Sequence, residues 1–152
     1  MSNPNLIKQI IIDKNDRVSQ LIQLIKNTDD HKYRNELIYT LVDNFKDKRI
    51  IPTLIDLIKK EDLKHYNASI IYACNEYSPY ECKDHISLFV DTVINGDYEA
   101  SMASAQLIID FPEPYDWEDD LLNRLENDLA SSLDKDNDNK EFIREVLKLF
   151  RD

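Results

Sequence analysis

Residues 21–26 read Leu-Ile-Gln-Leu-Ile-Lys, and 33 positions later residues 54–59 read Leu-Ile-Asp-Leu-Ile-Lys. Over the aligned segments 21–41 and 54–74, nine of 21 positions are identical, including the pairs Tyr33/Tyr66 and Tyr39/Tyr72. A further slide of 35 positions gives a weaker third copy, in which residues 68–69 and 103–104 both read Ala-Ser. A period near 34 is typical of stacked helical repeats, so we interpret the chain repeat by repeat.

Each copy predicts two amphipathic helices that are joined by a short polar turn, because the apolar residues recur at helical spacing. Hairpin turns and sustained alternation are absent, which argues against a sheet. We therefore expect one all-α domain, a right-handed α-solenoid of about four helical hairpins with capping helices. Its parts are an N-terminal cap over 1–16, repeats over 17–47, 50–79 and 85–111, and a C-terminal helical pair over 116–152.

Several local features carry their own expectations. Tyr33 starts a predicted apolar stripe that continues through Leu37, and Tyr66 holds the same place one repeat later. The pair Asn95-Gly96 predicts a left-handed backbone at a helix end. Cys74 falls on an apolar stripe and is expected to be a small core residue.

The charge and the glycine content narrow the classes of function. Thirty acidic residues against 19 basic ones give a formal charge of −11, which repels nucleic acid phosphates and favours a basic protein partner. Solubility is the alternative explanation of that charge. A phosphate-binding loop, a dinucleotide-binding turn and a nucleophile elbow each require several glycines, and this sequence has only Gly96. We expect no cofactor, no direct nucleic acid contact and no enzymatic activity.

The sequence also carries expectations about location. No stretch approaches the roughly 20 apolar residues of a membrane span, and the first residues lack a secretion signal. We expect a cytoplasmic protein that has free thiols, no membrane contact and a monomeric free state.

The segment Leu-Ile-Asp-Leu-Ile at 54–58, a short acidic turn, and Tyr-Asn-Ala-Ser-Ile-Ile-Tyr-Ala at 66–73 together resemble a HEAT repeat. The resemblance covers roughly residues 18–111 and implies a HEAT/armadillo-like solenoid whose second helices line a concave surface. Tyr33 and Tyr66 stand where many such repeats carry an arginine or lysine. In size, charge and architecture the chain also resembles bacterial immunity proteins, which implies that it binds a basic, nuclease-type toxin domain.

In the second helix of each repeat, the residues on the side opposite the apolar stripe form the candidate partner-binding surface. Tyrosines supply contact area, and carboxylates pair with Arg or Lys of a partner. The alternative is that Tyr39 and Tyr72 pack between neighbouring repeats. The three equivalent sets are Glu36, Tyr39, Thr40 and Asp43; Ser69, Tyr72, Ala73 and Glu76; and Ser104, Leu107, Ile108, Asp110 and Phe111.

Two further segments allow two interpretations each. Tyr115 and Trp117 extend the binding surface, or Trp117 closes the edge of the core. Residues 134–145 nearly fit a calcium loop, or Asp138 and Glu141 cap the last helix. His and Cys spacings of a zinc site are absent from the sequence, so we predict neither metal ligands nor catalytic residues.

These observations lead to a non-enzymatic protein-binding module, most concretely an immunity protein or antitoxin that inhibits a toxin domain. A general scaffold or regulatory adaptor is the alternative. An enzyme on a helical-repeat scaffold, such as a lyase or glycosylase relative, is the third class.

Overall fold

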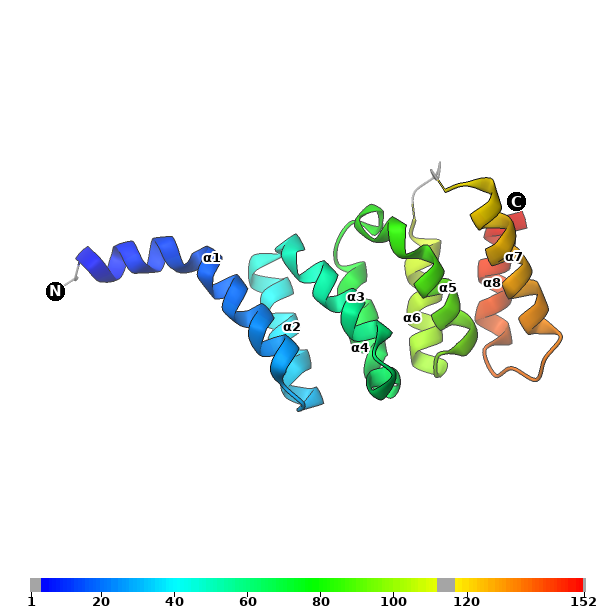
Figure 1. Ribbon diagram of the computed structural model, residues 1–152, viewed down its shortest axis with the longest axis horizontal. Helices are drawn as coiled ribbons and strands as arrows, with labels where there is room; N and C mark the ends of the chain where they lie inside the picture. The colour runs from blue at the N-terminus through cyan, green and yellow to red at the C-terminus, as the bar shows by residue number, and fades with distance from the viewer. Residues whose placement is uncertain (1–3, 112–116, 152) are drawn as a thin grey trace. The chain divides into compact units, whose positions relative to one another are not determined.

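The structure is a computed structural model that describes residues 4–111 and 117–151, and every regular element in these ranges is helical (Figure 1). Side chains are described from Asp16 onward, except those of Pro79 and Tyr80. The predicted all-α class is confirmed. The chain divides into two compact units, Met1–Thr53 and Leu54–Asp152, which we describe separately.

The first unit is built from two helices that pack against each other, α1 (Pro4–Asn27) and α2 (His31–Phe45). Helix α1 runs without a break through residue 16, at which the predicted N-terminal cap ends. Asp30 caps the start of α2 by accepting a 3.1 Å hydrogen bond from the Tyr33 N–H. Lys46, at φ 43°, ends α2 in the left-handed conformation that closes many helices.

The 3₁₀ helix η1 (Lys48–Ile50) leads into α3 (Ile51–Lys59), and the unit boundary falls within α3. The elements that follow in the second unit are η2 (Glu61–Tyr66), α4 (Asn67–Asn75), η3 (Pro79–His85), α5 (Ile86–Asn95), α6 (Tyr98–Ile109), α7 (Asp119–Leu133) and α8 (Lys140–Arg151).

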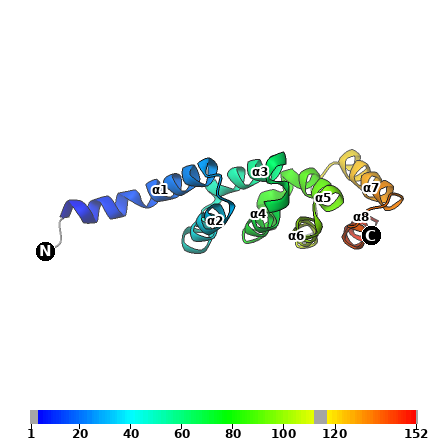
Figure 2. The same ribbon diagram turned by 90° about the horizontal axis from the view of Figure 1, so that it is seen from below.

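Two rows of helices form the second unit. Helices α5 and α6 pack as one hairpin, and α7 and α8 pack as another. The second helices lie side by side, with α6 between α4 and α8, while α5 contacts α7 in the other row (Figure 2). The small residues Ala100, Ala103 and Ala105 are buried on α6, where they let its neighbours approach closely.

The tyrosines at the repeat turns are exposed, contrary to the prediction for the apolar stripe. Tyr33 is 42% exposed and Tyr66 is 47% exposed. The residue that directly follows each tyrosine is buried instead: Arg34 is 4% exposed and Asn67 is 5% exposed. The tyrosines point outward because these polar side chains reach back to the preceding helix.

Gly96 does not adopt the predicted left-handed conformation, since its φ and ψ are −70° and 166°. Its role is to permit close approach of the backbone. A Cβ atom at this position would lie 2.6 Å from the Thr92 carbonyl oxygen, to which the Gly96 N–H donates a 2.8 Å hydrogen bond. Glycine is needed here for space and not for backbone freedom.

Candidate partner-binding surface

Large apolar side chains that remain exposed are concentrated on the second helix of each hairpin. In the part of the chain whose side chains are described, nine such residues are exposed, and only Leu24 and Tyr66 lie elsewhere. Exposed apolar groups that gather on one surface often mark a binding site. The other seven are Tyr33 and Tyr39 on α2, Tyr72 on α4, Tyr98, Met102 and Ile109 on α6, and Leu149 on α8.

In the first unit, the structure brings the predicted residues of α2 together. Glu36, Tyr39 and Asp43 are all exposed, and their spacing of three and four residues places them on one face of the helix. Tyr39 is 41% exposed, and Tyr72 in the second unit is 38% exposed. Both side chains are thus partly exposed at the surface.

In the second unit, Asp110 is held in place by two neutral amides. Asn75 Nδ2 donates to Asp110 Oδ2 over 3.1 Å, and Gln106 Nε2 donates to Asp110 Oδ1 over 3.0 Å. One donor belongs to α4 and the other to α6, so the contact also ties the two helices together. The carboxylate remains exposed, and its orientation is fixed before any partner arrives.

Three of the predicted acidic residues, one in the first unit and two in the second, occupy helix ends at which a carboxylate is unfavourable. Glu76 directly follows α4, Asp110 directly follows α6, and Asp43 lies in the last turn of α2. The last turns of these three helices contain no basic residue. Because the C-terminal end of a helix carries partial negative charge, each carboxylate strengthens a negative potential there. The ends of α4 and α6 therefore favour a cationic group, whereas Lys46 already lies directly after α2.

We call the exposed side chains of α4, α6 and α8, with the residues that directly follow α4 and α6, the second-helix surface. Only one residue of the predicted third set belongs to it, because Ser104, Leu107, Ile108 and Phe111 are buried and Asp110 alone is exposed. Ala73 of the second set is buried as well, and Ser69 is half-buried. The members of the surface are Tyr72 and Glu76 on or directly after α4, Tyr98, Glu99, Met102, Gln106, Ile109 and Asp110 on or directly after α6, and Glu141, Arg144, Glu145, Lys148, Leu149 and Arg151 on α8.

The third set of predicted surface residues is mostly wrong because the third repeat was aligned with a slide of 35 positions. A slide of 34 positions, in place of 35, puts Gln106 on Tyr72 and Asp110 on Glu76, all four of which are exposed. The same slide pairs Ile70 with Ser104, and both are fully buried. The period of 34 was therefore the signal that could have identified the exposed positions of α6.

Trp117 is tied into the interior of the second unit. Its Nε1 donates a 2.8 Å hydrogen bond to the Lys83 carbonyl oxygen in η3, and its ring makes an edge contact with Phe111 at 5.3 Å. This arrangement supports the interpretation in which Trp117 closes the edge of the core. Tyr115 lies outside the described residues.

The segment that resembles a calcium loop holds the α5–α6 turn through its asparagines. Asn137 Nδ2 donates to the Ile94 carbonyl oxygen over 3.0 Å, and Asn139 Nδ2 donates to the Gly96 carbonyl oxygen over 2.8 Å. The Ile143 N–H donates to the Asn139 carbonyl oxygen over 3.0 Å, so Asn139, and not the predicted Asp138, occupies the N-cap position before α8. No cluster of three His, Cys, Asp or Glu with metal-binding geometry occurs among the described residues.

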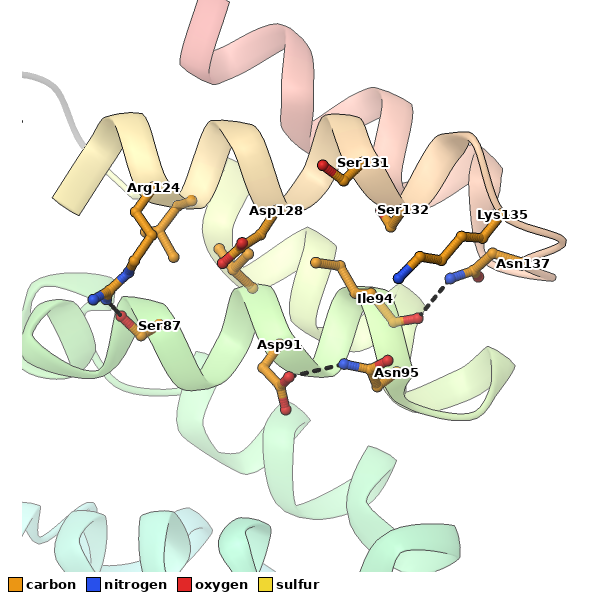
Figure 3. Close-up of a pocket in the computed structure, with 12 residues that line it drawn as sticks. Ser87, Asp91, Ile94, Asn95, Arg124, Asp128, Ser131, Ser132, Lys135 and Asn137 are labelled. Atoms are coloured by element: carbon orange, nitrogen blue, oxygen red, sulfur yellow. Dashed lines mark hydrogen bonds between the residues drawn. The ribbon is translucent and has the colours of Figure 1, made fainter. Parts of the chain in front are cut away.

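A polar groove of about 460 Å³ lies between α5 and α7, in the other row of helices (Figure 3). Arg124 and Lys135 line it toward its two ends, with Asp128 between them on α7. The Arg124 guanidinium donates a long hydrogen bond of 3.4 Å to Ser87 Oγ. The buried Ser132 hydroxyl donates a 2.6 Å hydrogen bond to the Leu129 carbonyl oxygen. The described residues that line the groove include no histidine.

None of the described helices combines the length and the apolar character that crossing a membrane requires. No protein-family model, no curated protein and no solved structure matches the chain.

Proposed function

We propose that the protein is a non-enzymatic protein-binding module, and most concretely an immunity protein that neutralises a basic, nuclease-type bacterial toxin domain. The observation that carries the proposal is the second-helix surface, where Tyr72, Met102 and Ile109 are exposed beside Glu76 and Asp110. Apolar anchors beside carboxylates suit a protein partner that presents Arg and Lys.

Asp110 is the residue best prepared to receive such a cation. Its two amide partners, Asn75 and Gln106, already fix the carboxylate, so little side-chain freedom is lost on binding. Both amides are neutral and leave the negative charge uncompensated. A partner guanidinium would pair with that charge and would also relieve the unfavourable position of Glu76 at the end of α4.

The formal charge of −11 acts at longer range. It accelerates the encounter with a positively charged domain and disfavours nucleic acid, the substrate that a nuclease toxin itself binds. Blocking a basic active site with an acidic surface is the simplest form of such inhibition.

We also infer that the hairpins stack as a right-handed HEAT-like solenoid, with the second helices on one concave surface. Two observations support this inference: the row formed by α4, α6 and α8, and the polar residue that recurs at the start of α2, α4 and α6.

The test is co-expression with the toxin domain encoded by the adjacent gene, followed by calorimetric titration of the purified pair. We expect one tight complex whose affinity falls with salt, and a loss of at least about tenfold on Glu76→Lys. Asp56→Lys, the same change of charge at an exposed site of α3, is the matched control. The double variant Tyr39→Ala/Glu76→Lys is expected to weaken binding further while its helicity is kept.

Equal losses in the Glu76→Lys and Asp56→Lys variants would discard the second-helix surface. A gene neighbourhood without a toxin or secretion gene, or several weak partners of similar affinity, would favour the scaffold or adaptor instead.

A further inference from the structure

A second, smaller groove lies between the α3–η2 segment and α5 of the second unit. Its volume is about 180 Å³, which is enough for several water molecules but less than most drug-sized ligands need. Residues from 58–67 line one wall, and residues from 88–96 line the other. No member of the second-helix surface lines this groove.

Asn67 brings a buried acceptor without a donor to this groove. The residue is only 5% exposed, and its Nδ2 donates to the Ile58 carbonyl oxygen over 3.2 Å. This bond fixes the orientation of the amide, because the opposite orientation would set two oxygens against each other. The buried Oδ1 accepts no hydrogen bond from a described residue. Since a buried acceptor without a donor is costly, we expect its donor to come from outside the chain.

Three lysines line the same groove. Lys59 and Lys60 are exposed, and neither forms an ion pair with a described residue. Lys64 is half-buried, and its Nζ lies 3.7 Å from Glu61 Oε1. Ammonium groups that gather in this way repel one another, although the chain has 30 acidic residues against 19 basic ones. Their grouping therefore favours an anion in the groove.

The α5 wall supplies acceptors instead of cations. Asp91 Oδ1 accepts a 2.8 Å hydrogen bond from Asn95 Nδ2, which leaves Asp91 Oδ2 and Asn95 Oδ1 able to accept from a ligand. Both residues are exposed. With three lysines against the carboxylates of Glu61 and Asp91, the lining is net positive in a protein whose formal charge is −11.

We propose that this groove is a binding site for a small phosphate monoester with free hydroxyl groups, the chemistry of a sugar phosphate. The phosphate pairs with the lysines, whose ammonium groups act as point charges and impose little geometry. One hydroxyl donates to Asn67 Oδ1, and others donate to the acceptors of α5. Water alone would satisfy Asn67 but leave the lysines without a counter-charge, and an anion without a hydroxyl would lack the donor.

The experiment titrates glycerol 3-phosphate, methyl phosphate and glycerol separately into the full-length ¹⁵N-labelled protein at low salt and records ¹H–¹⁵N spectra. We expect glycerol 3-phosphate to bind at one site, with a dissociation constant below about 1 mM, and to shift the side-chain amide signal of Asn67. Methyl phosphate has the charge without the alcohol groups and should bind at least about fivefold more weakly. Glycerol, which has no charge, should not bind.

Three results would overturn the proposal: no binding of glycerol 3-phosphate, equal affinity for the two phosphates, or shifts confined to residues outside the groove. The inference is independent of the proposed function, because these titrations contain no protein partner and the groove lies apart from the second-helix surface.

A double variant tests the charges. Lys59→Gln/Lys60→Gln is expected to weaken binding of glycerol 3-phosphate at least about tenfold. The matched control Lys32→Gln/Lys148→Gln removes the same charge at exposed positions outside the groove and should keep the wild-type affinity. Equal losses in the two variants would contradict a site at the groove. Circular dichroism checks that both variants fold, and the Asn67 signal of the wild type decides the question should one of them fail.

Discussion

Ser101 Oγ donates a 2.6 Å hydrogen bond to the Val93 carbonyl oxygen, and Ser101 is fully buried. Val93 lies in the last turn of α5, where carbonyl groups have no partner within the helix. Two other hairpins repeat the contact: Asn67 Nδ2 donates to the Ile58 oxygen over 3.2 Å, and Arg34 Nη2 donates to the Thr28 oxygen over 2.6 Å. A polar residue near the start of α2, α4 and α6 thus binds a carbonyl oxygen at the end of the helix before it.

Replacing this donor should destabilise the protein. Ser101→Ala leaves the Val93 oxygen without the hydroxyl, and we expect the free energy of unfolding to fall by about 1–3 kcal/mol. Urea unfolding followed by circular dichroism measures the change. Ser131→Ala, at an exposed position of α7, is the control and should change stability little. Equal effects of the two substitutions would contradict the role of Ser101.

The variant Gly96→Ala tests whether glycine is needed at position 96 for its backbone conformation or for the space that a Cβ atom would occupy. Alanine tolerates the observed φ of −70°, so a purely conformational effect would stabilise the protein by about 0.4–1 kcal/mol. The Cβ atom would instead lie 2.6 Å from the Thr92 oxygen, and relieving this clash should cost about 1–3 kcal/mol. The sign of the change in the thermal midpoint decides between the two, and a more stable variant would refute close approach.

Neutralising Glu76 should stabilise the free protein. Glu76→Gln removes a negative charge from the end of α4, which we expect to contribute about 0.3–1 kcal/mol to the free energy of unfolding. Asp119→Asn is the matched control with the opposite sign, because Asp119 lies in the first turn of α7, where a carboxylate is favourable. Both effects should shrink near 1 M salt, where the Debye length is about 3 Å. A destabilising Glu76→Gln would show that the local potential is not negative.

The positions of Leu107 and Met102 test the alignment of the third repeat. Leu107 is fully buried, whereas Met102 on the same helix is 37% exposed. Leu107→Ala should cost about 2–5 kcal/mol in chemical unfolding. Met102→Ala should have a much smaller effect on stability, and it should weaken binding of the partner. The reverse order would restore the predicted assignment of Leu107 to the surface.

The apolar periodicity of the sequence was sufficient to predict the helices, because burying one face of a helix requires apolar residues at a spacing near 3.6. It also predicted the burial of Cys74 and the exposure of Glu36, Asp43, Glu76 and Asp110. These predictions succeeded because each depends on a single helix and on which of its faces is apolar.

Contacts between helices decided the rest. Tyr33 and Tyr66 are aromatic and fit the helical spacing, yet the adjacent Arg34 and Asn67 are buried because each satisfies a carbonyl group at the end of the preceding helix. The setting of Asp110 depends on Asn75, 35 positions earlier in the sequence. Local spacing contains no information about such partners, since a hydrogen bond is possible only after packing brings both groups together. The sequence by itself therefore determined the helices and their acidic surfaces, and only the tertiary structure decided which polar groups are buried and which carboxylate is held in place.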